Sequence, residues 1–216
     1  MSGRRPLRPA PPARLFFGVF TPHARLFDAV RERIEARFGP CASEEESPPF
    51  PFPSTRTYAR SMGPGPFTRK FFFLRERWPQ DGLAPVKRSA IEIEEEVQCL
   101  EPFEFARAVN IDPGLLNDCR IILASTKDYA HRLYRADGVW EEVTLVFQDG
   151  AYRPLPWTYP DFRNPDVARH FAAIRERHLE TLMREAAASA AIAAPLTPPP
   201  ASAPPPGPRP PPPRSP

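Results

Sequence analysis

The chain has 216 residues, which is enough for one domain of ordinary size together with terminal tails. Its formal net charge is +3, but five arginines and no acidic residue lie in the two tails, so the body between them holds 24 basic and 26 acidic side chains. A body that is not basic argues against non-specific nucleic-acid binding, which needs a clustered positive face.

The two ends of the chain differ from the middle in composition. Residues 1–13 are rich in arginine and proline, and residues 195–216 hold 13 of the 33 prolines. Segments of this kind cannot bury a core, so we expect residues 1–13 and the alanine-rich and then proline-rich residues 186–216 to be disordered. Residues 14–185 should then fold as a single α+β domain.

Cysteine content and hydropathy indicate the compartment. Cys41, Cys99 and Cys119 are far apart and odd in number, which predicts free thiols in a reducing environment and neither a disulfide framework nor a zinc knuckle. No apolar run reaches the ~18 residues of a membrane span, and no signal-peptide core precedes the first predicted strand. We therefore expect a soluble cytoplasmic protein; its oligomeric state is not indicated.

The first half of the body alternates strand-like and helix-like segments. Residues 14–20 are an apolar, β-prone run, and Thr21 and Pro22 suit the cap and first position of an amphipathic helix that ends at Gly39-Pro40. We then predict a loop at residues 41–53, an edge strand at 54–59, a buried strand at 67–78 that forms a hairpin with it, and a helix at 84–100. The string IEIEEEVQ inside the last segment also alternates like a strand.

The second half is richer in strand signals. We predict strands at residues 106–111, 120–124, 129–134, 139–147 and 151–155. Asp137-Gly138 and Asp149-Gly150 are typical of hairpin turns, so the last three strands should form a meander. Residues 165–184 have the spacing of an amphipathic helix with Asn164 as its cap, and the alanine run after it could prolong this helix.

The order strand-helix-strand-strand-helix-strand at the start is that of a ferredoxin-like unit. The predicted fold class is therefore α+β, with a mainly antiparallel sheet, a ferredoxin-like βαββαβ start, added hairpin strands, a C-terminal helix and a disordered proline-rich tail.

Polar residues cluster after two of the predicted strands. Asn110 lies at the end of the first and Asp112 follows it, where Pro113-Gly114 is expected to force a turn that presents Asp112 as a general base or metal ligand. Alternatively, Asp112 only caps that turn.

Ser125, Thr126, Lys127 and Asp128 follow the second strand, and they suit a phosphate-bearing ligand: hydroxyls for its oxygens, a lysine for its charge, and a carboxylate for a cation or for the lysine. A helix cap is the competing explanation for these residues. The glycines of a P-loop are absent.

Other candidates lie further along the chain. Arg132 could neutralise phosphate, and His131 beside it could carry a proton. Only one of Glu141 and Glu142 can face the site from a straight strand, and we take Glu142 as the candidate. Trp157 and Tyr159 could stack on a base or simply cover the core. We assign catalytic roles to Asp112, Asp128 and His131, and ligand binding to Asn110, Ser125, Thr126, Lys127, Arg132, Glu142, Trp157 and Tyr159. We expect Asp112, Lys127, Asp128 and His131 to converge on one concave site.

Five strings of residues resemble a known family. RLFFGVF, VNIDPGLL, LASTKDYAHRLY, GVWEEVTLVF and WTYPDF occur in this order. Together they resemble a prokaryotic family described only as domain of unknown function 4416, over about residues 14–180. The chain differs from the family pattern Thr-x-Tyr-Tyr and Glu-Met-Gly, where it has Thr55-Arg56-Thr57-Tyr58 and Ser61-Met62-Gly63. The resemblance implies membership of this family but no reaction.

Two classes of function fit these observations. The first is an enzyme or a ligand-binding domain for a phosphorylated small molecule or nucleotide, in which Asp112 and Asp128 could hold Mg²⁺. The alternative is a non-catalytic interaction module whose exposed aromatic residues and tail recruit a macromolecule.

Overall fold

The computed structural model describes residues 9–53 and 55–193, the last four of these without their side chains. The expectations for residues 1–8 and 194–216 lie outside this range. The chain divides into two compact units, Met1–Thr181 and Leu182–Pro216, and the account below concerns the first. No helix among the described residues combines the length and the apolar composition needed to cross a membrane. All three cysteines are free thiols, as expected.

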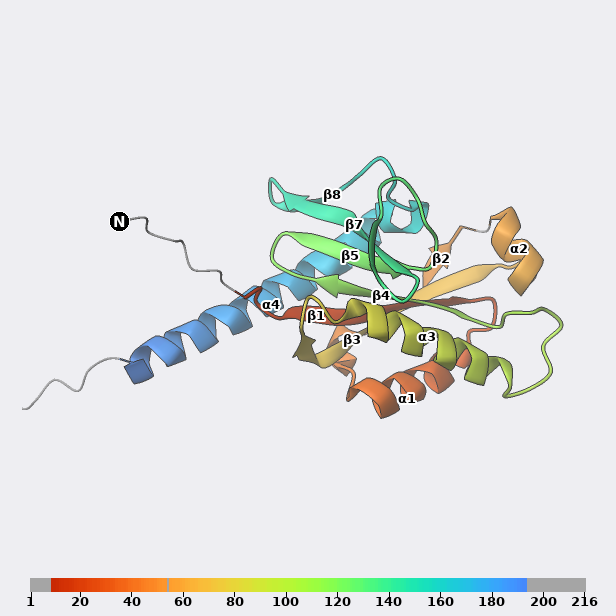
Figure 1. The fold of residues 1–216 in the computed structure, drawn as a ribbon, viewed down its shortest axis with the longest axis horizontal. Helices are drawn as coiled ribbons and strands as arrows, with labels where there is room; N and C mark the ends of the chain where they lie inside the picture. Colours follow the sequence, from red (N-terminus) through yellow and green to blue (C-terminus); the bar gives the residue numbers. More distant parts are fainter. Residues whose placement is uncertain (1–8, 54, 194–216) are drawn as a thin grey trace, which may run out of the picture. The chain divides into compact units, whose positions relative to one another are not determined.

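An antiparallel sheet of eight strands forms the centre of the first unit (Figure 1). The strand order is β2-β3-β1-β4-β5-β7-β6, and β8 also pairs with β7. The strands are β1 (Ala13–Thr21), β2 (Phe50–Phe52), β3 (Phe67–Trp78), β4 (Asn110–Leu116), β5 (Arg120–Ser125), β6 (Leu133–Ala136), β7 (Val139–Gln148) and β8 (Ala151–Pro154). The predicted α+β class with a mainly antiparallel sheet is confirmed.

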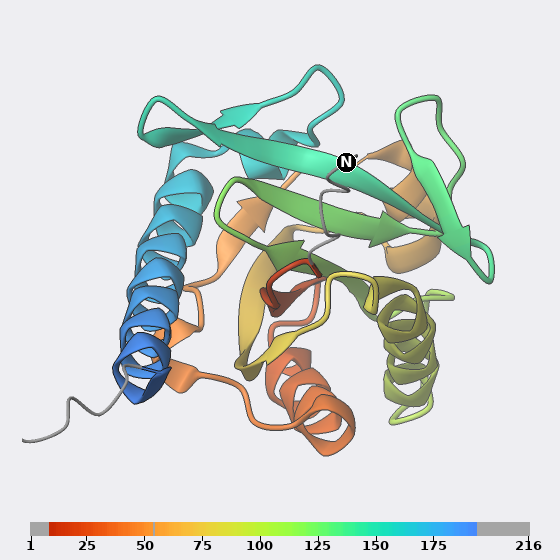
Figure 2. The ribbon, with the colours of Figure 1, turned by 60° about the vertical axis from the view of Figure 1, so that its left-hand side comes forward.

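Helices cover both faces of this sheet (Figure 2). The helices are α1 (Leu26–Phe38), α2 (Arg56–Met62), α3 (Leu83–Gln98) and α4 (Pro165–Ala193), with short 3₁₀ segments η1 (Ser43–Glu45) and η2 (Pro160–Arg163). In β1, Phe17 packs with the core under α1 and α3, whereas its neighbour Phe16 packs with the core under α4. Because side chains alternate along a strand, this burial on both faces explains why residues 15–20, LFFGVF, are apolar throughout.

The first four strands have the ferredoxin-like arrangement that the element order predicts. β1 lies between β3 and β4, and β3 lies between β1 and β2, with α1 and α3 as the connecting helices. The predicted strand at 67–78 and the predicted helix at 84–100 correspond to β3 and α3. The expected cap at Thr21 is wrong: α1 begins at Leu26, and the Thr21 hydroxyl donates to the Ala108 carbonyl at 2.7 Å. A buried long-range bond of this strand-end residue takes precedence over local capping.

The segment between α1 and β3 differs most from expectation. Residues 54–59 were expected as an edge strand, but α2 begins at Arg56 because the Thr55 hydroxyl accepts from the Tyr58 backbone N–H. The edge strand is instead β2, inside the predicted loop, where Pro51 is tolerated because an edge strand leaves one side of its backbone unpaired.

The most informative difference concerns Pro113-Gly114, which lies within β4 and makes no turn. β4 pairs with β1 along its whole length, but its pairing with β5 starts only at Gly114, opposite Leu123. Pro113 therefore lies where β4 has no partner on the β5 side. At Gly114 a Cβ would lie 2.5 Å from the Ile122 carbonyl oxygen, so this close approach requires glycine. From Gly114 back toward Asn110, β4 is no longer paired with β5, and the sheet has a gap between these two strands.

The C-terminal elements agree with expectation in outline. β6, β7 and β8 form the predicted meander, and the central residues of both Asp-Gly turns have positive φ, as tight hairpin turns require. β6 starts at Leu133, however, and the residues just before it form a turn. The Asn164 side chain accepts from the Asp166 N–H as predicted, and α4 continues through the alanine run to Ala193.

Candidate functional site

A pocket of about 600 Å³ occupies the gap between β4 and β5. The gap lets side chains from both faces of the sheet line one cavity: Lys87 and Glu94 from α3 on one face, and Arg69, Trp157 and Tyr159 from the other. A cavity of this size suits a small-molecule ligand. Ten of the eleven candidate residues line it, namely Asn110, Asp112, Ser125, Thr126, Lys127, His131, Arg132, Glu142, Trp157 and Tyr159. Asp128 does not.

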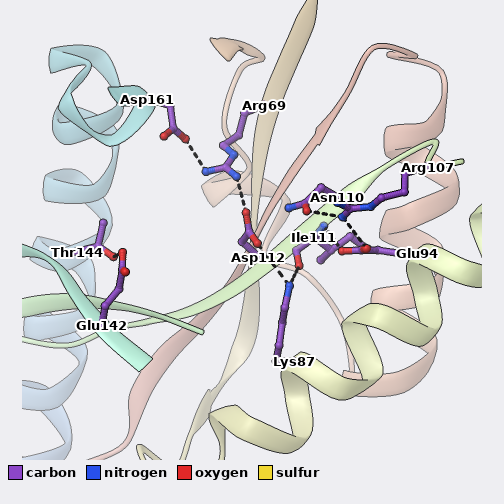
Figure 3. A network of polar contacts seen from close by, with 10 residues as sticks. All are labelled: Arg69, Lys87, Glu94, Arg107, Asn110, Ile111, Asp112, Glu142, Thr144 and Asp161. Carbon is purple, nitrogen blue, oxygen red and sulfur yellow. Dashed lines mark hydrogen bonds and ion pairs between the residues drawn. The ribbon is translucent and has the colours of Figure 1, made fainter. Parts of the chain in front are cut away.

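Asp112 lies at the centre of an inner network of charged residues (Figure 3). Its carboxylate accepts from Arg69 at 2.7 Å and lies 3.4 Å from the Lys87 ammonium, which also donates to the Ile111 carbonyl at 2.7 Å. Burial would raise the pKa of Asp112, but the charges of Lys87 and Arg69 outweigh it and hold the pKa below its ordinary value. Asp112 is therefore a carboxylate engaged by two cations.

Arg69 connects Asp112 to Asp161, and its side chain is only 4% exposed. Its guanidinium lies within 6 Å of four phenylalanine ring centroids, those of Phe20, Phe52, Phe71 and Phe162. Burial raises the pKa of Asp161 in spite of Arg69, whereas that of Asp112 is lowered. The two directions differ because only Asp112 has a second cation, Lys87, beside it.

Glu94 and Arg107 complete the inner network. Glu94 accepts from the Ile111 N–H at 2.7 Å and from Arg107 at 2.9 Å, and Arg107 also donates to the Asn110 side chain. Burial raises the pKa of Glu94, while Lys87 and Arg107 oppose that shift. The buried amide nitrogen of Asn110 makes no hydrogen bond of normal geometry within the described residues.

A second group of residues, the outer cluster, consists of Ser125, Lys127, His131, Arg132 and Glu142. The Glu142 carboxylate, 6% exposed, lies 2.9 Å from His131 Nε2 and accepts from Arg132 Nε at 2.7 Å. Arg132 also donates to the Ser125 hydroxyl at 2.6 Å and to the Lys127 carbonyl at 2.8 Å. Glu142 thus orders the segment that follows β5 through Arg132. Glu141 faces away and pairs with Arg135.

Aromatic rings flank the outer cluster. The His131 ring stacks on Tyr129 and on Trp157, with interplanar angles of 5° and 11°. The Trp157 indole N–H donates to the Val143 carbonyl at 2.8 Å, which fixes this ring. Tyr159 stacks on Phe52 and so partly covers the core edge, as its alternative interpretation proposed.

Lys127 differs from the other cations that line the pocket. No carboxylate of the described residues lies within ion-pair distance of its ammonium, which is 5.7 Å from the centroid of the Tyr58 ring. Arg69, Lys87, Arg107 and Arg132 each have a carboxylate partner. The pocket therefore has a surplus of positive charge at its outer end.

The side chains of Asp112 and Asp128, the two candidate metal ligands, do not converge on a common site. Both Asp112 oxygens are engaged by cations, and Asp128 is exposed outside the pocket. Across residues 9–53 and 55–193, no three His, Cys, Asp or Glu side chains are grouped so that they could hold a metal ion.

Sequence reasoning missed Arg69, Lys87 and Glu94 because they lie inside regular elements, and it missed Arg107, which lies in the loop before β4. A usable signal was present, however. Lys87 and Glu94 are seven residues apart on the face of α3 that also carries Val86, Ala90 and Ile93, and Arg69 points to the same side of β3 as Phe71. Charged residues at core-facing positions indicate a buried polar site.

Comparison with known proteins gives one match. No curated protein and no solved structure matches the chain. The model of one family, described as Domain of unknown function (DUF4416), matches residues 11–178, which confirms the resemblance seen in the sequence. The chain therefore belongs to this family.

Proposed function

We propose that the pocket binds a small molecule that carries a phosphate group, such as a nucleotide or a sugar phosphate. The observation that carries the proposal is Lys127, a cation at a cavity of about 600 Å³ with no carboxylate partner among the described residues. A phosphate oxygen would supply the missing partner, and a charge-assisted hydrogen bond of this kind is about twice as strong as a neutral one.

The residues around Lys127 supply further donors. Ser125 Oγ already accepts from Arg132 and from the Lys127 backbone N–H at 3.2 Å, so its own hydrogen remains to be donated. Thr126 adds a second hydroxyl at the pocket lining. The fixed Trp157 ring, 39% exposed, offers a face for a sugar or a base. The outer end of the pocket therefore suits the phosphate of the ligand. The inner network, whose charges are paired, suits a polar but uncharged part of the same ligand.

Removing the Lys127 charge tests the proposal. Lys127→Ala is expected to weaken binding roughly 10-fold to 100-fold, because a hydrogen bond to a charged group contributes about 1.5–3 kcal/mol. The midpoint of thermal unfolding should hardly change, since surface substitutions usually alter stability by less than about 0.5 kcal/mol. Binding is measured by titration calorimetry with inorganic phosphate, pyrophosphate, ribose 5-phosphate and nucleoside mono- and triphosphates, with and without Mg²⁺.

Arg169→Ala is the matched control, because it removes the same charge from an exposed position on α4 outside the pocket lining. Its affinity for each compound should equal that of the wild type. A Lys127→Ala protein that binds as tightly as the control would contradict the proposal.

A second candidate function, an interaction module, has one observation in its favour. Leu133 and Tyr134 on β6 are 73% and 60% exposed, and Tyr129 nearby is 53% exposed. Exposed apolar residues beside a strand edge are typical of protein-binding surfaces. Absence of binding by the wild type to every phosphate compound would favour this second function.

A further inference from the structure

Glu142 determines which nitrogen of His131 carries hydrogen. Its Oε2 accepts from the Arg132 guanidinium and lies 2.9 Å from His131 Nε2. A carboxylate paired with a guanidinium has no hydrogen to donate, so it is the acceptor in both bonds. Nε2 must then be the donor of that bond. In the neutral ring, Nδ1 consequently bears the free electron pair.

The His131 ring is held in one orientation. Tyr129 and Trp157 stack on it in near-parallel planes, and Trp157 is anchored to the Val143 carbonyl. No hydrogen bond engages Nδ1 within residues 9–53 and 55–193. His131 nevertheless lines the pocket, and its side chain is 23% exposed. A fixed imidazole with one nitrogen bound to a buried carboxylate and the other unengaged has the arrangement of a general base.

The same hydrogen-bonded group connects this imidazole to the proposed phosphate site. Arg132 binds Glu142 with Nε and binds the Ser125 hydroxyl and the Lys127 carbonyl with Nη1. One guanidinium therefore holds the carboxylate that orients His131 and the segment that carries Lys127. A phosphoryl group at Lys127 and the His131 ring would share the outer end of the pocket.

We propose that this site hydrolyses a phosphate ester, with His131 as the general base and Glu142 as its positioning residue; the inference rests on the proposed function. His131 Nδ1 accepts a proton from a water molecule whose oxygen attacks phosphorus. The new P–O bond forms as the bond from phosphorus to the ester oxygen breaks on the opposite side of phosphorus. The departing oxygen takes a proton from solvent, and His131 releases its proton to solvent. The products are inorganic phosphate and an alcohol, so atoms and charge balance.

Turnover of phosphate monoesters tests the step. Release of inorganic phosphate from para-nitrophenyl phosphate, ribose 5-phosphate and nucleoside monophosphates is followed by ³¹P NMR. His131→Gln is expected to lower kcat about 10²-fold to 10⁴-fold, the usual contribution of a general base, while calorimetric affinity stays close to that of the wild type. His23→Gln, a histidine outside the pocket lining, is the control and should keep full activity.

Glu142→Gln distinguishes a role of Glu142 in positioning His131 from a purely structural role. It should lower kcat less than His131→Gln and change the pH dependence of kcat, because the amide no longer selects one ring tautomer. A long-range ¹H–¹⁵N correlation spectrum of the full chain should show hydrogen on Nε2 of His131 in the wild type and a tautomer mixture in Glu142→Gln.

The outcomes distinguish the two proposals. Binding of a probe without turnover, or turnover unchanged in His131→Gln, would overturn general-base catalysis and leave the proposed binding function intact. Hydrogen on Nδ1 in the wild type would also overturn it. If no phosphate compound binds, both proposals fall.

Discussion

Replacing Arg69 with methionine is expected to lower the free energy of unfolding by about 3–5 kcal/mol, the usual cost of breaking a buried ion pair from one side. Methionine keeps an unbranched side chain among the four phenylalanine rings, so the loss reports mainly on charge. Asp161, 2% exposed, would lose its cation, and Asp112 would keep only Lys87. Urea denaturation measures the difference.

The decrease in the free energy of unfolding caused by Arg69→Met should depend on pH in a defined direction. Burial already raises the pKa of Asp161, and removal of Arg69 would raise it further. A carboxyl whose pKa is higher in the folded than in the unfolded state favours folding more as pH falls through the folded value. The deficit should therefore be full at about pH 8 and smaller at about pH 5. A deficit that grows on acidification would contradict the buried-charge explanation.

Two variants serve as controls for Arg69. Adding Asp161→Asn to Arg69→Met should recover part of the stability, since the uncompensated carboxylate is removed. Lys70→Met, at the next position of β3, removes a cation whose partner Glu46 is 18% exposed, so its loss should be smaller.

Gly114→Ala is expected to destabilise the protein by about 3 kcal/mol, near the upper end of the usual cost of overpacking. The new Cβ would clash with the Phe16 ring and would lie 2.5 Å from the Ile122 carbonyl oxygen of β5. A ring can turn aside, but a backbone carbonyl in a paired strand moves only if the pairing of β4 with β5 changes. The midpoint of urea unfolding measures the effect.

Gly18→Ala is the control for this position. Gly18 lies in β1, beside β4, where the nearest atom to an added Cβ is Phe71 Cε1 at 3.1 Å. A small shift of that ring would relieve the contact, so the loss should be clearly smaller than for Gly114→Ala. Equal losses would mean that the approach of β4 to β5 is not specially close.

Local patterns in the sequence were sufficient for most elements. Apolar runs marked β1, β3 and β5, helical spacing marked α1, α3 and α4, and the Asp-Gly pairs marked the meander turns. These signals depend on residues close in sequence. One error arose where a distant contact decided the outcome: the Thr21 hydroxyl donates to Ala108, which follows α3 in the chain. Another was local, because the cap at Thr55 starts α2 where a strand was expected.

The candidate site shows the same division. Sequence alone indicated the outer residues. Ser125, Lys127 and Arg132 follow a buried strand closely, and polar residues at this position are typical of a functional loop and not of a core. It could not show that Pro113-Gly114 continues a strand, since the local preference for a turn is outweighed by pairing with β1 along the whole of β4.

Only the tertiary structure brought the inner network together. Arg69, Lys87 and Asp112 come from three elements, and their contact depends on the gap that opens where β4 leaves β5 at Gly114. A single sequence records which residues are charged, but it does not record which charges meet, because ion pairs between distant segments follow from strand order and register. For the same reason it could not show that Glu142 binds both His131 and Arg132. Nor could it show that Lys127, of the cations that line the pocket, has no carboxylate partner among the described residues.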